Sequence, residues 1–185
     1  MHYYTINIAG LERDLPICRV TDDLYIGAFV PMGDAEIVVA SAKALLELAP
    51  EYDYILTSEA KGIPLAHEMA RQHSDSKYFV ARKYSKLYMT GVFEAKVRSI
   101  TTDKEQTLYL DTAEAELIKG KRVLIVDDVI STGESLNALE ILVNKAGGVI
   151  VGRMAILAEG EAQQREDLIY LQKLPVFNAD GTVKE

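Results

Sequence analysis

The segment from residue 123 to residue 135 constrains the fold more than any other part of the chain. It begins with the apolar run Val-Leu-Ile-Val, continues through Asp127 and Asp128, and ends in Val-Ile-Ser-Thr-Gly-Glu-Ser. An apolar run without alternation is typical of a parallel strand that is covered on both faces. The small residues predict a loop, and a helical pattern begins at about Ser135. We therefore expect an α/β fold with a central, mostly parallel sheet flanked by helices.

The carboxyl end of this strand is also the best candidate for a ligand site. Open α/β sheets bind ligands beyond the carboxyl ends of their strands. The loop brings backbone N–H groups to a helix N-terminus, where the helix dipole favours a phosphate. Two carboxylates beside an anion-binding loop suit a ligand with hydroxyls and a phosphate, such as a sugar phosphate. The alternative is a buried strand whose aspartates only cap a helix or a turn.

Two further segments place charged residues directly after predicted strands. The first follows a predicted strand at 54–57 and precedes a helix at 63–72 that has proline in its first turn. The second follows a predicted strand at 78–81 and is basic. Arginine is a bidentate partner for phosphate oxygens, and lysine is a mobile point charge. Taken alone, each segment could be a solvated surface turn. The residues are Glu59, Ala60, Lys61 and Gly62 in the first segment, and Arg82, Lys83 and Lys86 in the second.

The composition indicates a single soluble domain, with the cytoplasm as its expected location. The 185 residues, 49% of them hydrophobic and 26% charged, suffice for one α/β domain with a complete core. No apolar run approaches the roughly 20 residues that cross a membrane. The single cysteine, Cys18, cannot form an internal disulfide, which fits a reducing compartment. The net charge of −8 argues against nucleic-acid binding, which needs a positively charged face.

The part before the core is interpreted as a small cap. Residues 3–8 and 15–20 predict two strands, and their connection looks too long for a tight two-residue hairpin. We interpret residues 1–33 as an N-terminal hood over one end of the sheet. The core is expected over residues 34–178, with Asp34 as the N-cap of its first helix.

Two segments outside the regular core pattern are also assigned. Residues 84–106 are rich in threonine, serine, tyrosine and charge, and part of this stretch alternates like a strand pair. We expect an antiparallel excursion that acts as a flexible loop over the site, because a reactive sugar cation must be protected from water. Residues 179–185 are expected to be a frayed tail.

Residues 126–133 closely resemble the phosphoribosyl-pyrophosphate (PRPP) signature of the type I phosphoribosyltransferase family. The resemblance implies the type I fold, with Asp127 and Asp128 at the ribose hydroxyls and the loop at the 5-phosphate. The segment 59–62 resembles the pyrophosphate loop of the purine branch. Residues 82–87 resemble the Arg-Lys-x-x-Lys-Leu segment of adenine enzymes and, more loosely, that of xanthine enzymes. The implied phosphate-binding residues are Ser131, Thr132, Gly133, Glu134 and Ser135.

The resemblance also implies a reaction. A purine base would attack C1 of PRPP, which gives a nucleoside monophosphate and pyrophosphate, as in purine salvage. Asp127 and Asp128 would stabilise the oxocarbenium-like ribosyl group. Mg²⁺ would bridge pyrophosphate and ribose oxygens and meet the two aspartates indirectly, through PRPP or water. Lys61 and the basic segment would neutralise the departing pyrophosphate, and a homodimer is expected from the resemblance alone.

The choice of base is the least constrained part of this interpretation. Adenine is slightly preferred because of the Arg-Lys-x-x-Lys-Leu run. The stretch 98–102 lacks the acid that adenine enzymes carry in their loop, and Gly160 replaces the lysine of the xanthine enzymes' Glu-Lys pair. Phe29 is assigned either to base stacking or to the core. Glu159 is assigned either to a purine edge or to a helix cap.

Two other functions share parts of this sequence pattern. A PRPP-binding regulator of the purine-repressor type would keep the fold without catalysis, but it needs a DNA-binding module. The short stretch before the core has no helix-turn-helix pattern and no basic bias. An orotate-type enzyme would share the Asp-Asp-Val-Ile-Ser-Thr-Gly run but finds no support in residues 58–87.

Overall fold

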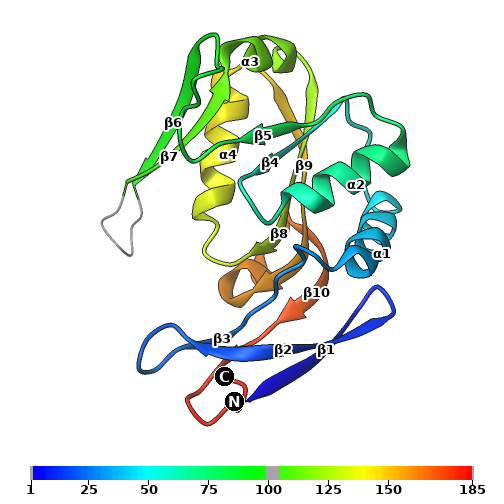
Figure 1. Ribbon diagram of the computed structural model, residues 1–185, viewed down its shortest axis with the longest axis vertical. Helices are drawn as coiled ribbons and strands as arrows, with labels where there is room; N and C mark the ends of the chain where they lie inside the picture. Colours follow the sequence, from blue (N-terminus) through cyan, green and yellow to red (C-terminus); the bar gives the residue numbers. More distant parts are fainter. Residues whose placement is uncertain (1, 99–104, 185) are drawn as a thin grey trace.

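A five-stranded parallel sheet forms the centre of the protein (Figure 1). The computed structural model describes residues 2–98 and 105–184. The strand order is β10-β9-β8-β4-β5, and all neighbouring strands are parallel. The expected α/β architecture is therefore confirmed. The strands are β4 (Tyr54–Ser58), β5 (Phe79–Ala81), β8 (Arg122–Ile130), β9 (Val149–Glu159) and β10 (Ile169–Leu174).

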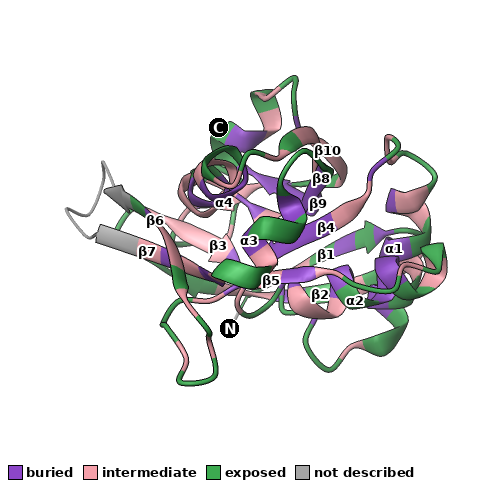
Figure 2. Cartoon of the chain, turned by 90° about the horizontal axis from the view of Figure 1, so that it is seen from above, coloured by how far each residue is buried: buried purple, intermediate pink, exposed green. Residues whose placement is uncertain are grey.

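Helices cover both faces of this sheet, which explains the unbroken apolar run in β8. Leu124 and Val126 belong to a buried cluster with residues of α1 and α2, whereas Val123 and Ile125 belong to a second cluster with residues of α4. Successive side chains of a strand point to opposite faces, so both faces need apolar residues. Figure 2 shows the buried strands between the helices. The helices are α1 (Ala35–Leu46), α2 (Ile63–His73) and α4 (Glu134–Lys145).

The neighbouring strands β4 and β8 form the topological switch point of the sheet. From β4 the chain passes through α2 to β5, on one side. From β8 it passes through α4 to β9, on the other side, and α2 and α4 pack on opposite faces. The loops that leave two such strands in opposite directions open a crevice at their carboxyl ends, where α/β proteins bind ligands. The loops in question are residues 59–62 and 131–133.

A second, four-stranded sheet forms the hood, in the order β1-β2-β3-β11. The two long strands pair from Ile8–Leu11 outward, so their connection is the two-residue turn Ala9-Gly10. Both turn residues have positive φ angles, 50° and 85°, as a tight hairpin requires. The prediction of a longer connection was wrong, because the charged residues that begin the second strand hid its start. The strands are β1 (Tyr3–Ile8), β2 (Leu11–Arg19), β3 (Tyr25–Gly27) and β11 (Val176–Phe177).

The C-terminal segment completes the hood. Val176 pairs with Ile26 of β3, and the N–H of Lys184 donates to the carbonyl of Val176 at 2.8 Å. Residues 178–184 therefore turn back onto β11 and are not the free tail that we expected. Figure 1 shows both ends of the chain close together in this sheet. The hood is consequently built from the first and the last residues of the chain, which the sequence pattern did not indicate.

A buried cluster and a group of ion pairs fix the hood to the core. Ile8 and Leu15 of the hood share a cluster with Ile37 of α1. The Arg13 guanidinium contacts Asp34 at 2.7 Å and Glu36 at 2.8 Å. Asp34 also accepts the N–H of Ile37 at 3.1 Å, which confirms it as the N-cap of α1. Since the Arg13 guanidinium donates to Asp34, it lowers the pKa of that carboxyl.

The excursion after β5 is an antiparallel hairpin, as expected. Its strands β6 (Val92–Arg98) and β7 (Glu105–Asp111) pair in full register, and the hairpin packs on α4. Asp111 then forms a capping box at the start of α3 (Thr112–Ile118). The lid is assigned to residues 84–106, and of these the residues 99–104, with Ser99, Thr101 and Thr102 among them, lie outside the described residues. A short 3-10 helix, η1 (Gly160–Gln164), follows β9.

Candidate active site

The acid pair lies near the carboxyl end of β8, facing the loop that follows β4. The residues Asp127 and Asp128 are 9% and 3% exposed. Asp127 accepts the N–H of Asp128 at 2.9 Å and lies 3.5 Å from the hydroxyl of Ser58. Burial, and then the charge of Asp128, raise the pKa of Asp127 to about 7. The two acids are thus buried at the switch point, with polar groups beside them.

Lys61 connects the β4 loop to the acid pair. Its Nζ lies 2.6 Å from Oδ2 of Asp128, and the lysine side chain is 46% exposed whereas that of the aspartate is 4% exposed. The lysine therefore reaches into the crevice from the solvent side and neutralises a buried carboxylate. A ligand hydroxyl that binds to Asp128 has to displace this lysine or share the carboxylate with it.

Gly62 allows the β4 loop to approach the acid pair closely. A Cβ atom built on Gly62 would overlap the Thr57 hydroxyl and would lie 2.8 Å from Oδ1 of Asp127. The backbone angles of Gly62, φ −73° and ψ −16°, are open to any residue. Close approach, and not backbone conformation, is therefore the reason for glycine at this position.

The basic segment after β5 surrounds the carboxylate of Glu59. The Arg82 guanidinium lies 3.3 Å and the Lys86 Nζ 3.9 Å from Oε1 of Glu59, and the backbone N–H of Lys83 donates to Oε2 at 3.0 Å. The hydrogen bond from Lys83, followed by the charges of Lys86 and Arg82, lowers the pKa of Glu59. The structure thus brings both predicted pyrophosphate segments together, with Glu59 holding the cations in place.

The loop after β8 leads directly into the first turn of α4. Gly133 is the N-cap residue with φ 77°, a left-handed conformation that glycine adopts without strain. It makes no side-chain cap hydrogen bond, and the positive end of the helix dipole of α4 lies at this loop. Ser131 and Thr132 precede it, and Glu134 and Ser135 begin the helix. The structure thus has the loop and helix start that the sequence predicted, and phosphate binding there stays a prediction.

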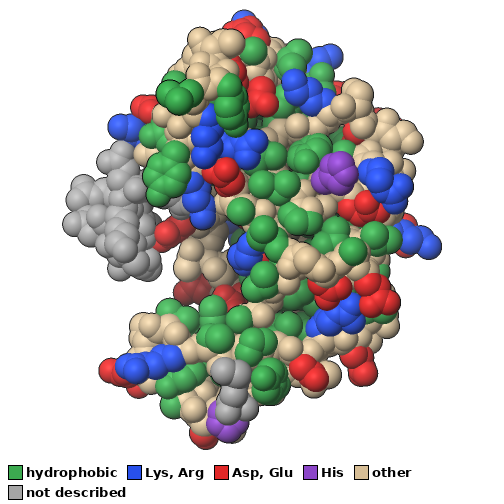
Figure 3. Space-filling model, in the orientation of Figure 1, with side chains coloured by type: hydrophobic (Ala, Val, Ile, Leu, Met, Phe, Trp, Pro, Cys, Tyr) green, Lys and Arg blue, Asp and Glu red, His purple; other side chains and the backbone are tan. Residues whose placement is uncertain are grey.

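A cleft of about 480 Å³ separates the hood from this loop. Figure 3 shows the hollow between the hood at the bottom and the core above it. The core contributes Ser131, Thr132, and residues 159–161. The hood contributes four apolar residues that we had not predicted, because their place depends on how the hood sits over β9. These are Val20, Leu24, Ile26 and Val176.

The two residues with open assignments lie in different places. Phe29 is 5% exposed and belongs to the buried cluster beneath α1 and α2, away from the cleft lining. Phe29 therefore packs in the core, and the prediction that it stacks on the base was wrong. Glu159 ends β9, lines the cleft and is 9% exposed. Burial raises the pKa of its carboxyl, and the charge of Lys61 opposes this shift.

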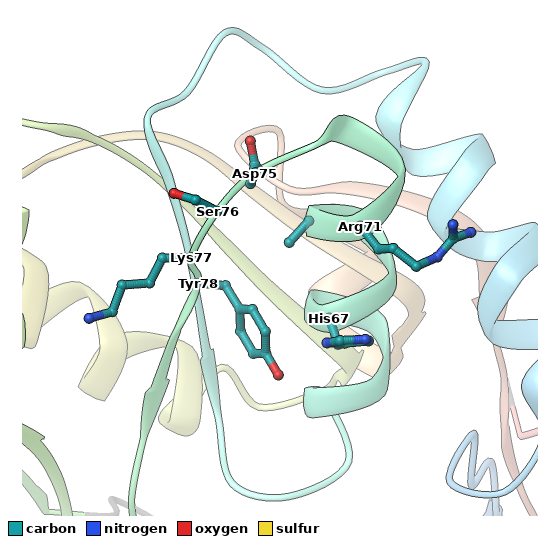
Figure 4. A pocket seen from close by; sticks show the side chains of 7 residues that line it. His67, Arg71, Asp75, Ser76, Lys77 and Tyr78 are labelled. Carbon is teal, nitrogen blue, oxygen red and sulfur yellow. The ribbon is translucent and has the colours of Figure 1, made fainter.

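Another cavity, of about 360 Å³, lies at the opposite end of the sheet. Figure 4 shows it between the second half of α2, with His67 and Arg71, and the segment that carries Lys77 and Tyr78. That segment precedes β5, so the cavity is at the amino ends of the parallel strands. It is therefore separate from the acid pair.

The described residues were also searched for metal-binding groups and for membrane-spanning helices. Within residues 2–98 and 105–184, no three acidic, histidine or cysteine side chains gather as a metal-binding group. In the same part of the chain, none of the helices has both the length and the apolar character to span a membrane.

The chain is similar to purine phosphoribosyltransferases of several names. A hypoxanthine/guanine phosphoribosyltransferase from Methanococcus voltae is 34% identical over 125 residues, which are 68% of this chain and 63% of that protein. An adenine phosphoribosyltransferase from Brachyspira hyodysenteriae is 32% identical over 124 residues, 67% of this chain and 68% of that protein. A xanthine phosphoribosyltransferase from Clostridium tetani is 30% identical over 120 residues, 64% of this chain and 62% of that protein. The relatives thus agree on the transferred group and differ in the base.

A domain model matches the same family, and a solved structure shows a similar fold. The structure of an adenine phosphoribosyltransferase from Rhodothermus marinus has a TM-score of 0.65 at 23% identity, over 93% of this chain and 94% of that one. The model of the phosphoribosyl transferase domain matches residues 35–181, which contain the acid pair and both loops. With most of its length in that match and the type I fold around it, this chain belongs to the phosphoribosyltransferase family.

Proposed function

We propose that this protein transfers the 5-phosphoribosyl group from PRPP to a purine base, with adenine preferred. The observation that carries the proposal is the acid pair beside the first turn of α4, at the switch point of the sheet and next to an apolar cleft. Two carboxylates suit ribose hydroxyls, a helix N-terminus suits a phosphate, and an apolar cleft suits a flat heterocycle.

Each part of PRPP would meet a different part of the site. The 5-phosphate would bind to the N–H groups of residues 131–135. The ribose hydroxyls would donate to Asp127 and Asp128, whose negative field favours the oxocarbenium-like transition state. The pyrophosphate would bind to Lys61 and to the cations that Glu59 holds together. The base would enter the cleft between the hood and Glu159.

The transfer exchanges one bond at C1 of the ribose. The bond from C1 to the pyrophosphate oxygen breaks, and pyrophosphate leaves with the electron pair. A ring nitrogen of the base forms the new bond to C1 and releases its proton to the solvent. Lys61 would leave Asp128 when the ribose binds and would then neutralise the leaving group. The 2.6 Å ion pair is therefore interpreted as the resting arrangement of the free protein.

The chemistry of the acid pair fits an Mg²⁺-dependent reaction. Carboxylate oxygens are ligands that Mg²⁺ accepts, together with phosphate oxygens and water. Because the described part of the chain offers no third acid nearby, Asp127 and Asp128 would hold the ion indirectly, through PRPP or water. When bound, Mg²⁺ would neutralise charge on the pyrophosphate. A homodimer and a cytoplasmic location stay predictions.

Pyrophosphate release with PRPP and Mg²⁺ tests the proposal. The protein is assayed with adenine, hypoxanthine, guanine and xanthine in turn, and at least one base should give turnover, with adenine first. The matched variant is Asp128→Asn, which should fold with a similar volume but lose turnover by on the order of a hundredfold or more. Binding of PRPP without turnover on any base would instead favour the PRPP-binding regulator.

A further inference from the structure

Arg165 reaches the loop after β8 from a different part of the chain. It directly follows η1, and Figure 1 shows this short helix, in orange, next to the start of α4. A Cβ atom built on Gly133 would lie 3.2 Å from Nη1 of Arg165. The guanidinium therefore packs against the turn to which we assign the 5-phosphate of PRPP.

Two acids hold this guanidinium in place. Nε and Nη2 of Arg165 donate to the two carboxylate oxygens of Asp167 at 2.9 and 2.8 Å, which is a bidentate pair. Nη2 also lies 3.7 Å from Oε1 of Glu140 on α4. Because these contacts are made by Nε and Nη2, they leave Nη1 on the side of Gly133. The hydrogen bonds from Arg165 lower the pKa of the Asp167 carboxyl, so the acid is ionised at neutral pH.

A second arginine contacts the same two acids. Nε of Arg153, in β9, forms an ion pair with Glu140 and lies 3.3 Å from Oδ2 of Asp167. The group thus contains two positive and two negative side chains, and its charges balance. Removal of either arginine leaves one negative charge in excess, whereas the contact with Gly133 is lost with Arg165.

We propose that Arg165 is a positioning residue for the phosphate loop, an inference that rests on the proposed function. Its guanidinium holds the left-handed turn at Gly133, and its charge adds to the positive end of the α4 dipole. A loop that is already ordered loses less conformational freedom when a phosphate binds. The same charge offsets the repulsion between the phosphate and the carboxylates of Glu140 and Asp167. Arg165 thus acts through the loop, without a contact of its own to the phosphate.

The inference predicts a loss of affinity that is confined to one part of PRPP. Arg165→Met removes the charge and should weaken the binding of ribose 5-phosphate by on the order of tenfold. Pyrophosphate with Mg²⁺, which we assign to Lys61 and the basic segment, should keep its dissociation constant. The KM for PRPP should rise by a similar factor with kcat nearly unchanged. Arg165→Lys keeps the charge without the planar fork and should recover part of the affinity.

Arg153→Met is the matched control, because it removes an arginine from the same group of ion pairs. Arg153 pairs with Ile125, five residues before the end of β8 at Ile130, so its strand position is remote from the loop. The control should lower the melting temperature about as much as Arg165→Met does, but bind ribose 5-phosphate nearly as the wild type does. Calorimetry on the full chain gives the dissociation constants, and circular dichroism gives the melting temperatures.

The outcomes separate this inference from the proposed function. If the affinity for ribose 5-phosphate depends on Arg165 as expected but no base supports turnover, the inference stands and the enzymatic function fails. If turnover is found and Arg165→Met binds ribose 5-phosphate like the wild type, the inference is wrong and the function stands. Equal losses in Arg165→Met and Arg153→Met also overturn the inference, as does an equal loss of pyrophosphate affinity in Arg165→Met. A wild-type protein that binds neither ribose 5-phosphate nor PRPP overturns both.

Discussion

Replacing Gly62 with alanine should lower the stability of the protein because of steric clashes, and not because of the backbone conformation. The backbone of Gly62 lies in the right-handed helical region, so alanine is allowed there. Without any clash, the smaller entropy of the unfolded chain would stabilise the variant by about 0.4 to 1 kcal/mol. The new Cβ atom, however, would overlap the Thr57 hydroxyl and approach Oδ1 of Asp127 to 2.8 Å. Whether the substitution raises or lowers the free energy of unfolding therefore depends on whether Thr57 and Asp127 can move.

We expect that they cannot move freely. Thr57 is fully buried in β4, and its hydroxyl has no hydrogen-bond partner in the described structure. Threonine is branched at Cβ, so few rotamers can carry the hydroxyl away. Overpacking of this kind costs about 1 to 3 kcal/mol. After subtraction of the entropic gain, Gly62→Ala should lower the free energy of unfolding by about 1 to 2 kcal/mol.

Urea denaturation measures the loss of stability, and a PRPP-binding assay measures the loss of affinity. The clash displaces Asp127, so the affinity for PRPP should fall together with the stability. Thr57→Ala removes the overlapping hydroxyl, and in the double variant it should restore most of the loss, with a coupling of about 1 to 2 kcal/mol. A Gly62→Ala protein as stable as the wild type would refute the reasoning, and so would a Thr57→Ala background that restores nothing.

Three further predictions follow from the charges of the site. Glu59→Gln should raise the KM for PRPP by on the order of tenfold, with kcat and the melting temperature nearly unchanged, because Arg82 and Lys86 lose the carboxylate that positions them; steady-state kinetics check this. The pKa of Asp127 is raised from 3.8 to about 7, so the folded protein binds the extra proton between these values. Its free energy of unfolding should therefore fall as the pH rises from 4 to 8, and Asp127→Asn should weaken this dependence; a parallel slope in the variant would contradict it. Lys61→Met should raise the KM for PRPP. It should also raise the pKa of Asp127 further, because the charge of Lys61 lowers that pKa, and a shift of the pH profile of PRPP binding to higher pH would show this.

The sequence determined the centre of the fold and the type of chemistry because both depend on local patterns. Four apolar residues before Asp127 can form a strand covered on both faces, and the small residues after Asp128 can form an anion-binding loop. The same reasoning found the residues 59–62 and the basic segment 82–86. Parallel strands align their carboxyl ends, so the order of these segments along the chain was enough to bring them together.

The sequence determined the loop over the site and the choice of base less well. The strand pairing of β6 and β7 followed from partial alternation, which is a local signal. Phe29 was assigned equally well to a core or to a site, since an aromatic residue suits both. Its burial was decided by the packing of α1 and α2 against the central sheet.

Only the tertiary structure decided how the hood closes the site. The pairing of Val176 with Ile26 joins strands from the two ends of the chain, and no local pattern encodes a contact across such a separation. For the same reason the apolar wall opposite Glu159 could not be found in the sequence. The ion pair of Lys61 with Asp128 likewise depends on two loops that meet only in the folded sheet. Local sequence thus determined which groups the protein has for chemistry, and long-range packing determined which of them face the same ligand.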